Sequence, residues 1–388
     1  MPDQYGVVLA RTIGTSPFSM LGITWGDPSA RLAAPVEIRT KAVATGQWSA
    51  WLRLDGDDSR GEETARRGGT DPVWVGPSDG AEVRIVADAA AVSALPEGLR
   101  LDLIDPGPGE PDTPATTWLP PTAAHGVPVG GTAARPPITS RAGWGADESI
   151  SPEPPGYLPG QRVKAVVVHH TAESNDYTCA DAPAVVRAIY TYHVRQLGWK
   201  DIGYNFLVDR CGTVYEGRKG GVDQPVMGAH AYGFNTETTG IAVLGDYTSV
   251  APSQAALAAV SELAGWKLSL HGVKPNGITT LTAGDAGRNY FGKTWSKGAQ
   301  LSFPTIHGHR DGYNTQCPGD QLYAQLPTIR ALAAGAARLS EEREEGWRSL
   351  LRHQATAVSG RWGTVTIVSA IALMAGAALT GRSAAMSE

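Results

Sequence analysis

The N-terminal quarter of the chain consists of short segments in which apolar and polar residues alternate. In segments such as VEIRTKAV, AEVRIVAD and LRLDLID, apolar residues recur at about every second position. Turns such as ATGQ and GPSDG separate these segments. A period of two is the pattern of a strand with one buried face, and many short strands between turns are typical of a β-sandwich. We therefore predict an all-β, sandwich-like N-terminal domain over residues 1–104.

Trp48 and Trp51 raise the question of a binding surface on this domain. They are three positions apart, so on one regular strand they would point to opposite faces. Only the outward one, together with Trp74, could then contribute to a sugar-binding surface. The competing interpretation is that bends or loops cover it too, because large aromatic side chains mostly pack inside.

Residues 105–137 interrupt the pattern with nine prolines among Gly, Thr and Ala. This composition cannot bury a core and favours extended chain, so we predict a linker. Beyond it, β-branched runs such as VKAVVVHH and TGIAVLGDY predict strands that are covered on both faces. YNFLVDRCGTVYEG predicts two strands around a tight turn, and FPTIHGHRD predicts a further short strand.

Two longer stretches have helical periodicity. DAPAVVRAIYTYHVRQLGW carries apolar residues on one stripe, with Asp181 as a candidate N-cap and Pro183 in the first turn. PSQAALAAVSELAGWKLSLHG is a second helix, and Gly272 is placed to end it. Strands that alternate with helices predict an α/β domain over residues 138–335, with a mixed central sheet flanked by helices.

The C-terminal region carries a charged stretch followed by an apolar one. Residues 336–361 predict a charged helical stalk, and residues 362–381 contain no charge over a length that can cross a bilayer. We predict a C-terminal transmembrane helix and hence a lipid bilayer as a partner. The alternative is an apolar helix that packs on the domain. The arginines around the segment would place its upstream side inside, contrary to an exported domain, so orientation stays open.

Composition excludes one class of partner. The 33 basic and 38 acidic residues are mixed along the 388-residue chain and give a formal net charge of −5. Such a chain has no basic field for a polyphosphate backbone, so nucleic acid is not an expected partner.

The three cysteines are Cys179, Cys211 and Cys317. This odd count suits one disulfide plus one thiol with a separate role, and we expect Cys179 to pair with Cys211. Such a pairing needs an oxidising compartment, although the N-terminus shows no secretory signal pattern.

The remaining thiol enters a candidate metal site. His169 ends a predicted buried strand, His309 ends another, and Cys317 follows His309 in a loop. Two neutral imidazoles and a thiolate leave one tetrahedral position open, as in catalytic zinc sites. Taken singly, each of these residues has an ordinary structural explanation. A histidine at a strand end is commonly structural, and the spacing between His309 and Cys317 is common by chance.

Six segments of the chain carry a resemblance to a known family. They are TSRAGWGADES (139–149), VVVHHTA (166–172), WKDIGYNFLVDRCGTVYEGR (199–218), GAHAYGFN (228–235), GIAVLGDY (240–247) and GHRDGYNTQCPG (308–319). In this order they resemble the bacterial branch of the peptidoglycan recognition protein and type 2 N-acetylmuramoyl-L-alanine amidase family. The resemblance covers residues 138–335 and implies that family's α/β fold.

The resemblance also implies a reaction and a cofactor. Family zinc ligands match His169, His309 and Cys317, all of which are present. The implied activity is zinc-dependent hydrolysis of the amide between N-acetylmuramic acid and L-alanine of peptidoglycan, with zinc-bound water attacking the lactyl carbonyl. Members that only recognise cell wall typically lack the cysteine. The alternative kept beside the enzyme is a non-catalytic peptidoglycan-binding protein that uses the same groove.

Further site residues follow from the same resemblance. Tyr204 matches the family's catalytic tyrosine, which could orient water or relay a proton to the leaving amine. Thr315 matches a position that donates to the developing oxyanion. His230, Asn235 and Thr171 are candidate substrate-binding residues, or else polar residues that order their own loops. For Arg218, pairing with substrate carboxylates and pairing with an acid such as Glu216 both stay open. The implied setting is extracytoplasmic, at the cell envelope.

Overall fold

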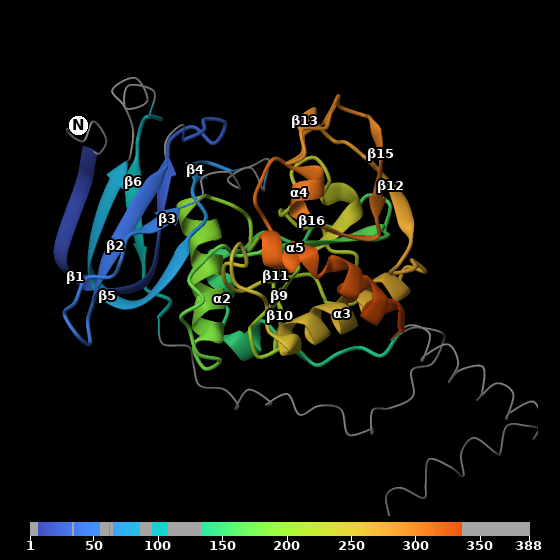
Figure 1. Cartoon of the computed structure of the whole chain (residues 1–388), viewed down its shortest axis with the longest axis horizontal. Helices are drawn as coiled ribbons and strands as arrows, with labels where there is room; N and C mark the ends of the chain where they lie inside the picture. The colour runs from blue at the N-terminus through green and yellow to red at the C-terminus, as the bar shows by residue number, and fades with distance from the viewer. Residues whose placement is uncertain are drawn as a thin grey trace, which may run out of the picture. The chain divides into compact units, whose positions relative to one another are not determined.

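The N-terminal region is a β-domain built around one hydrogen-bonded sheet (Figure 1). The computed structural model describes residues 7–32, 35–54, 62, 65–85, 95–107 and 133–335. The β-domain strands are β1 (Val7–Trp25), β2 (Val36–Ala42), β3 (Leu52–Leu54), β4 (Gly68–Gly69), β5 (Val73–Ile85) and β6 (Arg100–Ile104). They run antiparallel in the order β3-β2-β5-β1-β4, and β6 also pairs with β1. The predicted β-rich N-terminal domain is confirmed.

Alternation along β2 explains how this sheet forms its core. Val36, Ile38 and Thr40 are buried, whereas Glu37 and Arg39 on the other face are partly exposed. Val36 and Ile38 pack with apolar residues of β1 and β5 in one cluster. The period-two pattern read from the sequence therefore places the correct side chains inside.

The prediction that Trp48 and Trp51 point to opposite faces is wrong. The Arg39 guanidinium lies 5.3 Å from the Trp48 ring centre and 4.8 Å from the Trp51 ring centre. Both indoles therefore lie against the sheet face that carries Arg39. Residues 49–51 are not in a strand, so the two-residue period that underlies the prediction does not apply to them.

A second sheet forms the centre of the α/β domain, in the order β16-β8-β11-β9-β10-β7. Its strands are β7 (Ile138–Thr139), β8 (Ala165–His170), β9 (Phe206–Val208), β10 (Val214–Glu216), β11 (Thr238–Val243) and β16 (Ile306–Gly308). β16, β8, β11 and β9 are parallel to one another, β10 is antiparallel to β9, and β7 is parallel to β10. The predicted mixed sheet is confirmed.

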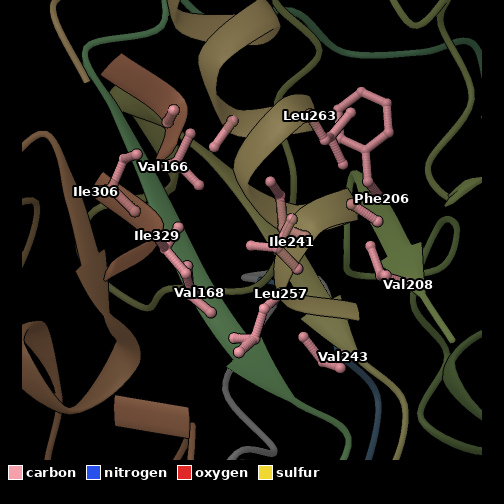
Figure 2. Packing of buried hydrophobic residues seen from close by; sticks show 14 of the residues in the cluster. Val166, Val168, Phe206, Val208, Ile241, Val243, Leu257, Leu263, Ile306 and Ile329 are labelled. Atoms are coloured by element: carbon pink, nitrogen blue, oxygen red, sulfur yellow. The ribbon is translucent and has the colours of Figure 1, made fainter. Parts of the chain in front are cut away.

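Helices cover both faces of this sheet. α3 (Gln254–Ser269) and the helical residues 326–335 pack on one face, where Leu257, Leu263 and Ile329 share an apolar cluster with residues of β8, β9 and β11 (Figure 2). α2 (Ala182–Thr191) continues into the π-helical turn η3 (Tyr192–Gln196) and packs on the other face. The 3-10 helices η1 (Ala142–Trp144), η2 (Glu148–Ile150) and η4 (Asn235–Glu237) complete the described helical elements with α4 (His309–Gly312) and α5 (Asp320–Ala324).

A module between α3 and β16 has no counterpart in the predicted elements. β12 (Ile278–Thr282) pairs with β15 (Gln300–Pro304), and the shorter β13 (Gly287–Arg288) pairs with β14 (Thr294–Trp295). Leu281 and Phe303 of this module pack on Val167 of β8 and on Phe234. The hairpins therefore build a wall beside the loop that contains Phe234.

The described residues of the β-domain pack directly on α2 and η3. Met20, Trp74 and Ile104 share a buried cluster with Tyr192 and other side chains of the α/β domain. The Tyr192 hydroxyl donates to the backbone oxygen of Thr70 at 2.8 Å. The described parts of the two domains thus share apolar core.

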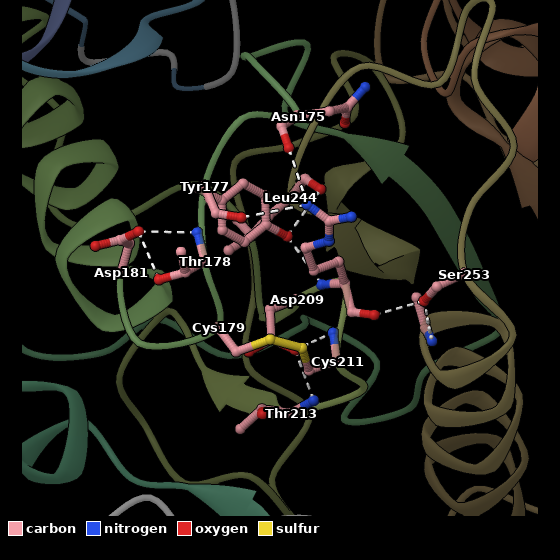
Figure 3. The surroundings of a disulfide bond; sticks show 12 residues. Asn175, Tyr177, Thr178, Cys179, Asp181, Asp209, Cys211, Thr213, Leu244 and Ser253 are labelled. Carbon is pink, nitrogen blue, oxygen red and sulfur yellow. Dashed lines mark hydrogen bonds between the residues drawn. A yellow bond between two sulfur atoms is a disulfide. The ribbon is translucent and has the colours of Figure 1, made fainter.

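The predicted disulfide between Cys179 and Cys211 is present (Figure 3). It joins the segment before α2 to the turn between β9 and β10, where Gly212 adopts φ 84°. Asp181 stands at the start of α2, but its carboxylate accepts from the backbone and hydroxyl of Thr178 and not from the helix. The predicted N-cap bond is therefore replaced by a local turn.

Within residues 7–335, no described helix is both long enough and apolar enough to span a membrane. The predicted stalk at 336–361 and the predicted transmembrane helix at 362–381 lie outside the described residues.

Candidate metal centre

Two of the three predicted metal ligands stand at the same edge of the central sheet. His169 lies near the carboxyl end of β8, and His309 follows directly after β16, the parallel neighbour of β8. The carboxyl ends of parallel strands share one edge, so the topology brings these residues together. His309 is the first residue of α4, not the last residue of a strand as predicted.

Cys317 returns to the same place from the loop after α4. One ligand atom from each of His169, His309 and Cys317 lies within 4.8 Å of the others, and all three residues are buried. Nδ1 of His169 lies 3.6 Å from Sγ of Cys317. Zinc bonds of about 2.1 Å to nitrogen and about 2.3 Å to sulfur separate two tetrahedral donors by about 3.6 Å. The donor set and this spacing fit a zinc ion.

The surroundings of His169 favour the neutral imidazole that a metal requires. Burial, and then the neighbouring imidazoles of His309 and His230, hold the pKa of His169 well below its ordinary 6.5. The backbone N–H of His170 donates to Sγ of Cys317 at 3.4 Å, and this Sγ also lies 3.8 Å from the His170 backbone oxygen. Neutral imidazole and thiolate are the forms that ligate a metal.

Residues between the ligands hold the Cys317 loop in place. The Arg310 backbone N–H donates to the Cys317 oxygen at 2.9 Å, and its guanidinium bonds Asp320 at 2.7 Å and the Gln316 oxygen. Asp311 accepts from the Gly308 N–H at 2.9 Å and from the Tyr323 hydroxyl at 2.7 Å. Arg310 and Asp311, which follow His309 in the sequence, therefore hold the loop and strand end of the cluster in place. No sequence motif indicated this role.

Tyr204 and Thr315, the predicted catalytic residues, border the cluster. The Tyr204 ring centre lies 5.4 Å from that of His169, and Tyr204 is 8% exposed. The Thr315 hydroxyl oxygen accepts the Cys317 N–H at 3.1 Å. The structure thus brings both residues next to predicted ligands.

The three candidate substrate-binding residues make internal contacts. Nδ1 of His230 lies 3.0 Å from Nε2 of His169. The Asn235 side-chain oxygen accepts the N–H groups of His230 and Ala231. The Thr171 hydroxyl donates to Glu173 and accepts from Gly245 N–H. These contacts agree with the interpretation that the residues order their own loops, and substrate contact stays a prediction.

Two arginines connect the β-domain to this region. Arg218 pairs with an acid, as one of the two alternatives expected, but the acid is Glu62 of the β-domain, at 3.0 Å, and Arg218 is 9% exposed. Arg31 donates to the Tyr313 hydroxyl at 3.1 Å, and the Tyr313 ring stacks on His309 with a ring-centre distance of 5.5 Å. No sequence pattern connects Arg31 with Tyr313 or Glu62 with Arg218, because the contacts join distant segments.

A mixed sheet with a buried His-His-Cys cluster, bordered by a tyrosine and a threonine, defines an amidase-like α/β domain. Comparisons with known proteins agree with this class. A family model described as N-acetylmuramoyl-L-alanine amidase matches residues 159–320, and one described as Rv3811 N-terminal galactose-binding domain-like matches residues 3–114. The second match covers the β-domain.

Relatives and solved structures match about half of the chain. Peptidoglycan-recognition protein SC2 of Drosophila simulans is 31% identical over 194 residues, or 49% of this chain and 85% of that protein. Peptidoglycan recognition protein 1 of Bos indicus is 34% identical over 187 residues, or 48% and 80%. The solved structure of Drosophila PGRP-LB is 25% identical, with a TM-score of 0.38, and covers 50% of this chain and 93% of its own. The chain belongs to the peptidoglycan recognition protein and type 2 amidase family.

Proposed function

We propose that this protein is a zinc-dependent N-acetylmuramoyl-L-alanine amidase, which hydrolyses the amide between the lactyl group of N-acetylmuramic acid and L-alanine in peptidoglycan. The observation that carries the proposal is the buried cluster of His169, His309 and Cys317 with ligand atoms within 4.8 Å of one another. Tyr204 and Thr315 beside it supply the groups that amide hydrolysis needs besides a metal.

When bound, zinc supplies a Lewis acid that acidifies a water and polarises the scissile carbonyl. Thr315 would donate a hydrogen bond from its hydroxyl towards the lactyl oxygen as negative charge grows there, while its oxygen accepts the Cys317 N–H. The leaving amine needs a proton, and the Tyr204 hydroxyl would orient water or relay that proton. The burial of these residues keeps bulk water from competing for the polar contacts.

The test uses the full chain and purified peptidoglycan. We expect stem peptides with a free L-alanine amine, detected by mass spectrometry, from zinc-loaded protein. Chelation should abolish the product and added zinc should restore it. Cys317→Ala should be inactive while its circular dichroism spectrum matches the wild type.

The same experiment separates the enzyme from the wall-binding alternative. If wild type and Cys317→Ala bind peptidoglycan equally and neither releases stem peptides in zinc, the enzyme proposal fails and the binding protein remains. Unrelated acyl amides should not be cleaved, since the lactyl-alanine bond is the proposed substrate.

The proposal also implies an extracytoplasmic location, because the substrate lies there and the Cys179–Cys211 disulfide persists in oxidising compartments. Non-reducing peptide mapping of native protein should find the two cysteines joined. Finding both thiols free in protein from the native host would contradict this location.

A further inference from the structure

His230 occupies a position that the proposed reaction leaves without a role. It is 5% exposed and lies in the loop before β11. Its Nδ1 lies 3.0 Å from Nε2 of His169, while the other nitrogen of His169, Nδ1, faces Sγ of Cys317 at 3.6 Å. His169 therefore stands between the candidate metal position and His230, with one ring nitrogen towards each.

We propose that His230 is a positioning residue for the metal centre, which fixes the tautomer and ring orientation of His169. This inference rests on the metal-binding part of the proposed function. His169 can ligate through Nδ1 only if its ring proton is on Nε2, because a ligating nitrogen must offer a lone pair. The Nε2–H of His169 then donates to Nδ1 of His230, which must be unprotonated.

The structure holds the His230 ring in one place. A Cβ on Gly240 of β11 would lie 2.4 Å from Cγ of His230, and a Cβ on Gly228 would lie 2.6 Å from Cδ2. Only glycine leaves room for the ring at these two positions. Asn235 fixes the loop backbone by accepting the N–H groups of His230 and Ala231 at 2.9 and 2.8 Å. Nδ1 of His230, the acceptor for His169, is thus held in position by its surroundings.

The remaining nitrogen of His230 supports a role other than stability. Its Nε2 is buried and has no hydrogen-bond partner among the described residues. With Nδ1 as the acceptor, Nε2 carries the proton, and a buried donor without a partner disfavours folding. If the side chain served only packing, an apolar residue without the Nε2–H would stabilise the fold more. A hydrogen-bond partner of His169, by contrast, needs the imidazole.

Outer partners of metal-bound histidines typically contribute about 10–100-fold to metal affinity. His230→Leu and His230→Asn form a matched pair of similar shape, because the Asn side-chain oxygen stands where Nδ1 of histidine was. We expect His230→Leu to weaken zinc binding by about 10–100-fold and His230→Asn to restore most of that loss. Affinity would be measured in the full chain by competition with a chromophoric chelator.

Two further variants make the experiment specific. Gly240→Ala removes no polar atom but should displace the His230 ring, so its zinc affinity should fall as in His230→Leu. His193→Asn removes another buried imidazole, one that stacks on Trp199 with ring centres 4.4 Å apart, and should leave zinc affinity unchanged. The absorption spectrum of cobalt-substituted protein should shift in His230→Leu and not in His193→Asn, since it reports ligand geometry.

The outcomes separate the inference from the proposed function. If wild type binds zinc and His230→Leu binds it within twofold, or if His230→Asn is as weak as His230→Leu, the positioning role is wrong while the amidase proposal stands. If the wild-type chain binds no zinc, both are wrong.

Discussion

Glu173 shows at the residue scale how burial changes an ionisable group near the site. Its Oε1 accepts the Thr171 hydroxyl at 2.8 Å, and its Oε2 is buried without a hydrogen-bond partner among the described residues. Burial raises the pKa of Glu173 from an ordinary 4.5 to about 8. The carboxyl is therefore held mainly in its neutral form at pH 7.

This shift predicts a pH-dependent stability. Because the folded state binds the Glu173 proton more tightly than the unfolded state, the free energy of unfolding should fall as pH rises from about 4.5 to about 8. Glu173→Gln removes the ionisation and should be more stable than wild type at pH 7, by on the order of 3 kcal/mol. Urea unfolding across this range would measure it, and an equal gain at pH 4 would contradict it.

Thr315 provides a second prediction at this scale. Thr315→Val keeps the shape of the side chain but loses the hydroxyl that borders Cys317. We expect the turnover number on peptidoglycan to fall about 10²-fold with little change in KM, since the donation develops in the transition state. Thr315→Ser should retain most activity. Equal zinc content in all three proteins is the control, and undiminished turnover by the valine variant would remove Thr315 from the mechanism.

At the element scale, α3 has the N-cap that α2 lacks. Ser253 accepts the Ala256 N–H at 3.0 Å, and its hydroxyl also bonds the Arg210 oxygen, as Figure 3 shows. The serine thus joins the helix start to the turn next to Cys211. A residue that caps a helix and anchors a loop contributes to both elements.

Ser253→Ala should destabilise the protein by about 1 kcal/mol, the usual value of a lost N-cap. Thermal unfolding would show a lower midpoint. Ser249→Ala, at an exposed serine ahead of the helix, is the matched control and should change little. A midpoint unchanged in Ser253→Ala would mean that Ser253 does not stabilise the helix start.

Apolar periodicity predicted the type of most elements, but it did not predict the hairpins that pack beside the loop containing Phe234. β8, β11 and α3 follow from uninterrupted apolar runs and a capped helical stretch. The hairpins β12–β15 and β13–β14 are short, and Ile278 in β12 is 78% exposed. β12 buries only Leu281, and β15, which does alternate with Leu301 and Phe303 buried, is too short for its pattern to identify the element.

At the scale of the whole molecule, glycines of the β-domain allow close contact with the α/β domain. A Cβ on Gly22 of β1 would lie 2.6 Å from Cε2 of Tyr192, and one on Gly69 of β4 would lie 2.6 Å from the Tyr192 hydroxyl. The Tyr192 ring packs on bare backbone of the neighbouring domain. Any side chain there would push the two domains apart.

Gly22→Ala should therefore lower the free energy of unfolding by about 1–3 kcal/mol, the usual range for overpacking a core. Urea unfolding and limited proteolysis of the linker region would reveal looser docking. Gly160→Ala, where a Cβ meets no atom within 4 Å, is the control. If Gly22→Ala unfolds like Gly160→Ala, the domains do not depend on this contact.

The sequence by itself determined the strands of the central sheet and the helices α2 and α3, the disulfide pairing, and which histidines and cysteine form the cluster, but not the hairpins between α3 and β16. These follow from local periodicity and from residues in recognisable motifs. Only the tertiary structure decided that His230 faces His169, that Arg218 pairs with Glu62, and that the β-domain rests on Tyr192. The physical reason is that such contacts join residues far apart in the chain, and their geometry is set when the sheet and its loops pack.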